Sequence, residues 1–137
     1  MSIDTDPYSS ERPLLEIPIE HWSPGMTQVV DFCKRVSPVL LDGQNISVSI
    51  ANDAAITNRS VYAHGILVLN LFKLGKKFFE DFPDNIEELF DILLHELAHE
   101  YERDHSSPQY YNALTRLGAR LTMLALKDPV FLNGHES

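Results

Sequence analysis

The chain has 137 residues, a length that fits one compact domain. Its composition, 44% hydrophobic and 23% charged, is that of a globular protein and argues against general disorder. Eleven basic residues against twenty acidic ones give a net charge of −9, which argues against a protein that lives by binding nucleic-acid phosphates.

The N-terminal part of the chain predicts a tail, an extended arm and a helix. Residues 1–13 are polar and aperiodic, as expected of a flexible tail. Apolar and polar residues alternate over 15–20 with the period of a strand, which Pro18 limits to an edge strand or an extended arm. Ser23-Pro24 is typical of a helix start, and Ser37-Pro38 predicts the end of that helix.

The middle of the chain predicts strands. Apolar residues alternate with serines over Asn45–Ile50, which is the pattern of a half-buried strand. Val61–Leu69 is a second candidate strand, and a hairpin-like connection through Asn52–Arg59 would place the two strands side by side. Asn70–Phe82 is a mixed segment that can hold a short helix.

Two helices are predicted in the C-terminal part of the chain. Asp84 can cap the first one, and Glu87, three residues later, completes a capping-box pattern. An apolar stripe at helical spacing then continues to Tyr101. Ser107-Pro108 predicts the start of the second helix, whose leucine stripe runs to about Lys127.

Together these elements predict the α+β class, with a short mixed sheet packed against the two C-terminal helices. We expect one domain over residues 14–128, between an N-terminal tail at 1–13 and a C-terminal tail at 129–137.

The first of the two C-terminal helices contains the sequence His95-Glu96-Leu97-Ala98-His99. Histidines at positions i and i+4 lie one above the other on one face of a helix, so both imidazoles can bind one metal ion. Glu96 lies about a quarter-turn away and can accept a proton from a water molecule that the metal makes acidic. With six histidines and ten glutamates in the chain, the chance expectation for this pattern is roughly 0.02.

A third histidine, His105, follows six residues after His99. A continuous helix would carry it out of reach of a shared ion, so the helix must end near Arg103-Asp104 and the chain must reverse. The new helix start at Ser107-Pro108 supports a reversal here, and the helix that follows contains no glutamate to serve instead. His95, His99 and His105 with one open position predict a site for one Zn²⁺ per chain.

These residues resemble the zinc signature of the zincin metallopeptidases. The spacing in His-Glu-Leu-Ala-His-Glu-Tyr-Glu-Arg-Asp-His is similar to the metzincin pattern, although Glu102 stands where those enzymes have a turn glycine. The continuation over 105–111 looks like the small bacterial WLM, YgjP-like and SprT-like peptidases, and the stretch to Gly118 is similar to the zincin-like tails of large ATP-binding proteins. The resemblance implies a zincin-like fold and a zinc-dependent peptidase with Glu96 as general base.

The resemblance also implies an edge strand above the zinc-binding helix that pairs with an extended protein or peptide substrate. His64–Asn70 is the candidate for this strand, and its expected substrate contacts are Gly65, Ile66, Leu67 and Val68. The same strand can instead form the centre of the sheet, and His64 is more readily a surface residue than a fourth ligand. Tyr110 and Tyr111 open the last helix, where one hydroxyl can donate to a developing oxyanion or both rings can pack against the leucine stripe.

Two other functions stay open at this point. One is a zinc-stabilised binding or regulatory module that acts with a larger or regulatory partner protein. The other is a YbeY-like zinc endoribonuclease, which the three histidines also resemble. Those enzymes lack a glutamate directly after the first histidine, and the acidity of this chain makes a nucleic-acid partner the weaker expectation.

The expected location is the cytoplasm. Cys33 is the lone cysteine, which excludes an internal disulfide and suits a reducing compartment. No run of residues approaches the ~20 apolar positions of a membrane span, and residues 1–10 lack the basic start and apolar run of a signal peptide. We therefore expect no membrane contact.

Overall fold

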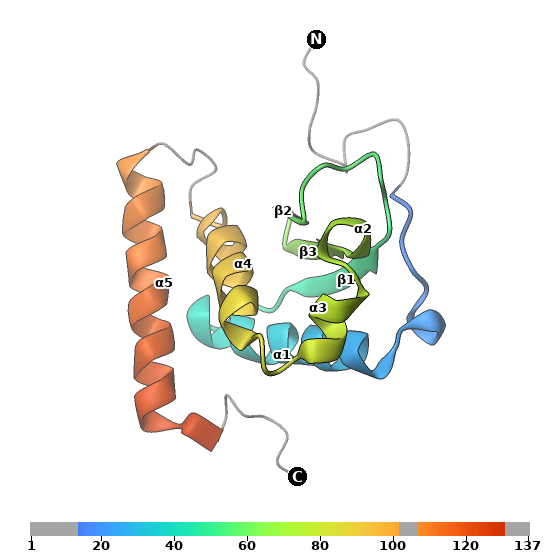
Figure 1. Cartoon of the computed structure of the whole chain (residues 1–137). Helices are drawn as coiled ribbons and strands as arrows, with labels where there is room; N and C mark the ends of the chain where they lie inside the picture. The colour runs from blue at the N-terminus through green and yellow to red at the C-terminus, as the bar shows by residue number, and fades with distance from the viewer. Residues whose placement is uncertain (1–13, 102–106, 131–137) are drawn as a thin grey trace.

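The computed structural model describes residues 14–101 and 107–130 and has the predicted α+β class (Figure 1). In chain order its elements are the 3₁₀ helix η2 (Ile19–His21), α1 (Pro24–Leu40), β1 (Ser47–Ala51), β2 (Ser60–Ala63), β3 (Ile66–Asn70), α2 (Leu71–Leu74), α3 (Lys76–Asp81), α4 (Ile86–Ala98) and α5 (Pro108–Lys127).

The three strands form a mixed sheet in the order β1-β3-β2. β1 runs parallel to β3, and β2 runs antiparallel to it. The predicted N-terminal arm is confirmed, because Ile17 N donates to Ile50 O at 2.8 Å and thereby covers the outer side of β1. β2 is therefore the open edge of the sheet in the described part of the chain.

The prediction of one continuous strand over Val61–Leu69 is wrong, because the chain turns back at His64 and Gly65. These two residues have φ angles of 55° and 75°, as in the two-residue turns of tight hairpins. The hairpin therefore joins β2 to β3, and the segment Asn52–Arg59 does not form a hairpin between the first strand and its neighbour. Gly65 was the signal for this turn in the sequence, because glycine readily adopts a positive φ angle.

The predicted substrate-binding edge at Gly65, Ile66, Leu67 and Val68 is also wrong. Gly65 lies in the hairpin turn, and the other three belong to β3, which is hydrogen-bonded to a strand on each side. A strand with two paired edges has no main-chain groups left to pair with a peptide. The alternative that this strand forms the centre of the sheet holds.

Asn70, at the end of β3, fixes the loop that leads into β2. Its Nδ2 donates to the carbonyl oxygens of Asp53, Ile56 and Asn58 at 3.1, 3.1 and 3.2 Å. Its Oδ1 accepts from Asp53 N at 3.0 Å. This buried side chain sets where β2 begins, and with it the position of Ser60.

The helix predictions hold at the Ser-Pro starts and fail at the C-terminal end of α1 and at both ends of α4. Ser23 and Ser107 both cap their helices as predicted. α1 continues past Ser37-Pro38 to Leu40, since Leu40 itself is buried in the core and Pro38 lies only in the last turn. The N-cap residue of α4 is Asn85 and not the predicted Asp84, and the Asn85 side chain makes no capping bond but donates to Phe78 O at 2.8 Å.

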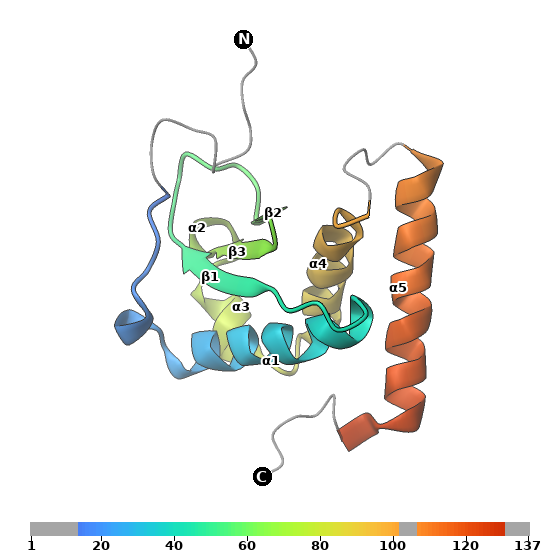
Figure 2. The same cartoon turned by 180° about the vertical axis from the view of Figure 1, so that it is seen from behind.

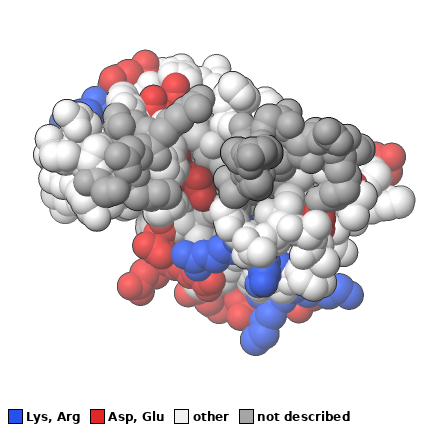
Figure 3. All heavy atoms as spheres, turned by 90° about the horizontal axis from the view of Figure 1, so that it is seen from above, with Lys and Arg blue, Asp and Glu red and all other residues white. Residues whose placement is uncertain are grey.

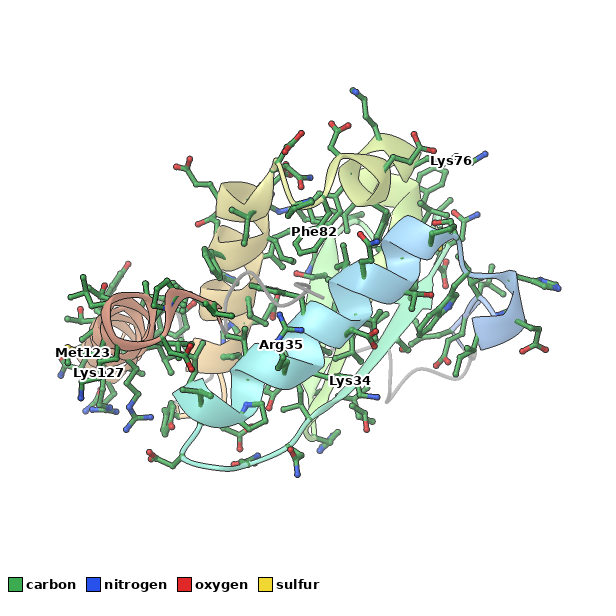
Figure 4. The ribbon with its side chains drawn as sticks, turned by 90° about the horizontal axis from the view of Figure 1, so that it is seen from below. Lys34, Arg35, Lys76, Phe82, Met123 and Lys127 are labelled. Carbon is green, nitrogen blue, oxygen red and sulfur yellow. The ribbon has the colours of Figure 1, made fainter. Side chains whose placement is uncertain are left out.

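α4 lies between the sheet and α5, and α1 crosses below them (Figures 1 and 2). The core between these layers includes fully buried side chains such as Val36, Leu69, Leu93 and Leu117. An aromatic cluster links α1 to α4: the ring of Phe32 lies 5.4 Å from that of Phe82 and 5.6 Å from that of Phe90. Figure 4 shows this underside, with Arg35 and Phe82 labelled. The Arg35 guanidinium lies 5.4 Å from the ring centroid of Phe32.

No helix in the described ranges combines the length and the apolar character needed to cross a membrane.

We predict that Gly25→Ala destabilises the fold. A Cβ at Gly25 would lie 2.3 Å from the carbonyl oxygen of Phe79, so α1 and α3 would have to move apart. Overpacking of this kind costs about 1–3 kcal/mol in the free energy of unfolding. Urea unfolding followed by far-UV circular dichroism measures the change.

Gly118→Ala is the matched control. Nothing lies within 4 Å of a Cβ at Gly118, which is inside α5. Alanine has the higher helix propensity, so this variant should gain about 0.5–1 kcal/mol. A Gly25→Ala protein as stable as the native one would contradict the close α1–α3 contact.

Candidate metal centre

His95 and His99 lie at the C-terminal end of α4. His95 is in the last turn of the helix, and His99 is its C-cap residue. Their ring centroids are 5.4 Å apart, and the ring planes are inclined by 83°. Two imidazoles that bind one Zn²⁺ tetrahedrally, with Zn–N distances of about 2.0–2.1 Å, have centroids about 5 Å apart. The spacing of the two rings is therefore compatible with a shared zinc ion.

α4 ends at Ala98, earlier than the predicted end near Arg103-Asp104. The next three amides, of His99, Glu100 and Tyr101, each donate to the carbonyl three residues before, at 3.0 to 3.1 Å. Neighbouring elements contact two of these three residues. Glu100 accepts a hydrogen bond from Tyr62 on β2, and the Arg116 guanidinium lies 5.3 Å from the ring centroid of Tyr101.

Glu96 is the buried member of the motif, with 7% of its surface exposed. Its Oε2 accepts a hydrogen bond of 2.6 Å from Ser60 Oγ on β2. Burial raises the pKa of the Glu96 carboxyl to about 7, and the Ser60 hydrogen bond and the charge of Arg59 oppose this shift. Ser60 therefore holds the carboxylate in one orientation beside the two histidines.

Two pairs of side chains join β2 to the C-terminal end of α4 and the turn after it: Ser60 with Glu96 and Tyr62 with Glu100. Glu96 lies in the last turns of α4, and Glu100 lies in the turn that follows the helix. Alternate residues of the strand therefore contact the end of the helix and the turn after it. The open edge strand is thus fixed against the helix that carries the motif.

Charges of both signs alternate beside this contact. Arg59 pairs with Glu88 at 3.5 Å and with Asp91 at 3.2 Å on the first half of α4. Seen from above, basic and acidic side chains lie interleaved along the lower border of the view (Figure 3). Such interleaving differs from the continuous basic groove that binds a nucleic-acid backbone.

Tyr110, in the first turn of α5, contacts both histidines. Its hydroxyl lies 2.8 Å from His95 O and 3.1 Å from His95 Nδ1, and its ring centroid lies 5.0 Å from that of His99. The side chain is buried, and burial, with Glu96 and Tyr111 nearby, raises the pKa of its hydroxyl to about 12. Tyr111, by contrast, is 59% exposed. Of the two predicted tyrosines, the structure brings Tyr110 to the motif.

His105, the predicted third ligand, lies outside the described residues. Over 14–101 and 107–130, no group of three or more His, Cys, Asp or Glu side chains is arranged to hold a metal ion. The described chain resumes at Ser107, the cap of the helix that brings Tyr110 to the histidines (Figure 1). His64 is exposed in the β2–β3 turn.

Ser60 and Tyr62 did not stand out in the sequence as members of the site. The sequence signal for them is that they alternate with the apolar residues Val61 and Ala63. Any half-buried strand shows such an alternation, so it does not identify residues of a site. Nothing in that alternation indicates which helix the polar face meets.

No protein-family model, no curated protein sequence and no solved structure matches this chain. A functional assignment therefore depends on the chemistry of the site.

We predict that Ser107→Ala weakens both the fold and zinc binding. Ser107 Oγ accepts a hydrogen bond of 3.1 Å from Tyr110 N, and loss of such a cap costs about 1 kcal/mol in the free energy of unfolding. The start of α5 then holds Tyr110 less firmly against the histidines. Thermal unfolding and zinc titration against a chelator measure the two effects.

Ser23→Ala is the matched control, because Ser23 caps α1 by the same contact, 3.2 Å from Met26 N. It should lose a similar amount of stability and keep its zinc affinity. Equal zinc affinity in the two variants would show that the α5 start does not support the candidate metal centre.

Proposed function

We propose that the protein is a zinc-dependent peptidase. The observation that carries this proposal is the placement of Glu96, a buried carboxylate held at 2.6 Å by Ser60 beside two histidines whose ring spacing suits one ion. A buried carboxylate on a helix that also presents two such histidines has no evident packing purpose, whereas a general base next to a metal needs this arrangement.

His95 and His99 would hold the zinc ion, with His105 as the third ligand. The bound ion would supply a Lewis acid that polarises the substrate carbonyl and makes an attacking water acidic. Glu96 would take the proton of that water as it attacks and would deliver a proton to the leaving amine. Because Ser60 occupies Oε2, the other carboxylate oxygen, Oε1, is the one that would carry the proton.

The substrate would be an extended peptide that pairs with β2, and not with β3 as first predicted. β2 is the open edge of the described sheet, and its side chains already contact α4 beside the histidines. Main-chain hydrogen bonds to an edge strand bind many sequences with similar strength. We therefore expect broad acceptance of unstructured peptides.

We predict about one zinc ion per chain in protein purified without chelators, as measured by elemental analysis. His95→Ala and His99→Ala should each lower zinc occupancy strongly, and combining His99→Ala with His105→Ala should abolish it. His21→Ala, in the exposed η2 helix, is the control and should keep full occupancy. Full occupancy in the double variant would refute the ligand assignment.

We predict that Glu96→Gln lowers peptide hydrolysis by at least about 10²–10⁴-fold, because the amide cannot take the proton. Zinc content and thermal stability should stay near native, since glutamine keeps the size of the side chain and can still accept from Ser60. The assay is a pool of unstructured peptides and a labelled single-stranded RNA, read with and without a chelator.

Glu87→Gln, an exposed change in the first turn of the same helix, is the control and should retain native activity. Equal peptide cleavage by Glu96→Gln and native protein would contradict the proposed base. Cleavage of RNA alone would favour the endoribonuclease, and a zinc-loaded protein inert toward both pools would favour the binding module.

A further inference from the structure

The hydroxyl of Tyr110 lies between two polar atoms of one residue, the carbonyl oxygen and the Nδ1 of His95. The two distances are 2.8 Å and 3.1 Å, both within hydrogen-bonding range. This contact determines which ring nitrogen of His95 carries a hydrogen.

A tyrosine hydroxyl has one hydrogen to donate. The carbonyl oxygen of His95 is an acceptor only, so at 2.8 Å it takes that hydrogen. The hydroxyl oxygen then faces Nδ1 with a lone pair and can only accept from it. Nδ1 must therefore carry a hydrogen, and in a neutral imidazole this leaves the lone pair on Nε2.

We propose that Tyr110 is a positioning residue that holds His95 in the Nδ1–H tautomer, so that Nε2 is the nitrogen offered to zinc. The inference rests on the proposed zinc site for its purpose. A histidine that binds a metal through one nitrogen commonly donates its other N–H to a protein group, which fixes the ring and raises its basicity. Tyr110 acts through His95, and no direct role toward the substrate is assigned to it.

The surroundings of Tyr110 make this contact rigid. The side chain is 3% exposed, and Ala113 and Leu117, on the same face of α5, are fully buried. The ring also packs against His99, with centroids 5.0 Å apart and planes inclined by 45°. One tyrosine therefore orients the first histidine and limits the movement of the second.

The first test measures the His95 tautomer in the metal-free native protein. Long-range ¹H–¹⁵N correlation spectra, recorded above the pH at which the histidines protonate, distinguish Nδ1–H from Nε2–H, and His95→Ala assigns the signals. We expect Nδ1–H. A native His95 in the Nε2–H form overturns the proposal, and this measurement needs no Tyr110 variant to fold.

The second test is Tyr110→Phe, which keeps the ring and removes the hydroxyl. The tautomer of His95 should shift toward Nε2–H, and zinc affinity, measured by competition with a chelator, should fall by about 10- to 100-fold. Tyr111→Phe, the same change at an exposed neighbour, should leave both unchanged. Tyr110→Phe with a native tautomer and native zinc affinity also overturns the proposal.

These outcomes separate the inference from the proposed function. The expected tautomer and zinc affinities in a protein that cleaves no peptide would support the role of Tyr110 and refute the peptidase. Peptide cleavage by a protein whose His95 carries its hydrogen on Nε2 would support the peptidase and refute the role of Tyr110.

Discussion

The buried carboxylate of Glu96 is the constraint on which the arrangement of the molecule depends. A carboxylate removed from water costs free energy unless a donor replaces the lost hydration, and the Ser60 hydroxyl is that donor. β2 must therefore lie against α4. The hairpin turn at His64-Gly65 and the loop held by Asn70 bring the strand there. The sheet and α4 thus contact each other at the buried carboxylate, the group that most needs a hydrogen-bond donor.

Local signals in the sequence predicted the parts of the fold that depend on local contacts. Ser23 and Ser107 cap their helices because a serine followed by proline satisfies the helix start within one turn. The cap predicted at Asp84 failed for the opposite reason. The neighbouring Asn85 side chain donates to Phe78 O, and α4 starts where that contact allows. The hairpin predicted through Asn52–Arg59 failed likewise, since nothing local indicates that β1 pairs with β3 in parallel.

In the candidate site, too, the residues close together in the sequence were predicted and the distant ones were not. His95, Glu96 and His99 lie within one helical turn or little more, so their spacing alone predicted a shared face. Ser60 is 36 residues from Glu96 along the chain, and Tyr62 is 38 residues from Glu100. Tyr110 was singled out as a possible oxyanion donor, but its hydroxyl contacts His95. Which atom the Tyr110 hydroxyl contacts depends on how α5 packs on α4. The packing angle between two helices cannot be derived from the spacing of residues in the sequence.

The burial of α5 is uneven along its length, and this has a consequence for its motions. Its buried side chains, Tyr110, Ala113 and Leu117, all lie in the half that faces the histidines. Further along, Met123 is 47% exposed and Leu126 is 74% exposed, and Figure 4 shows Met123 and Lys127 on the outer side of the helix. A helix end with few buried contacts opens with a small free energy. Backbone amides of the last two turns should therefore exchange with deuterium well before those near Tyr110. The helix can fray at one end while its other end stays ordered beside His95 and His99.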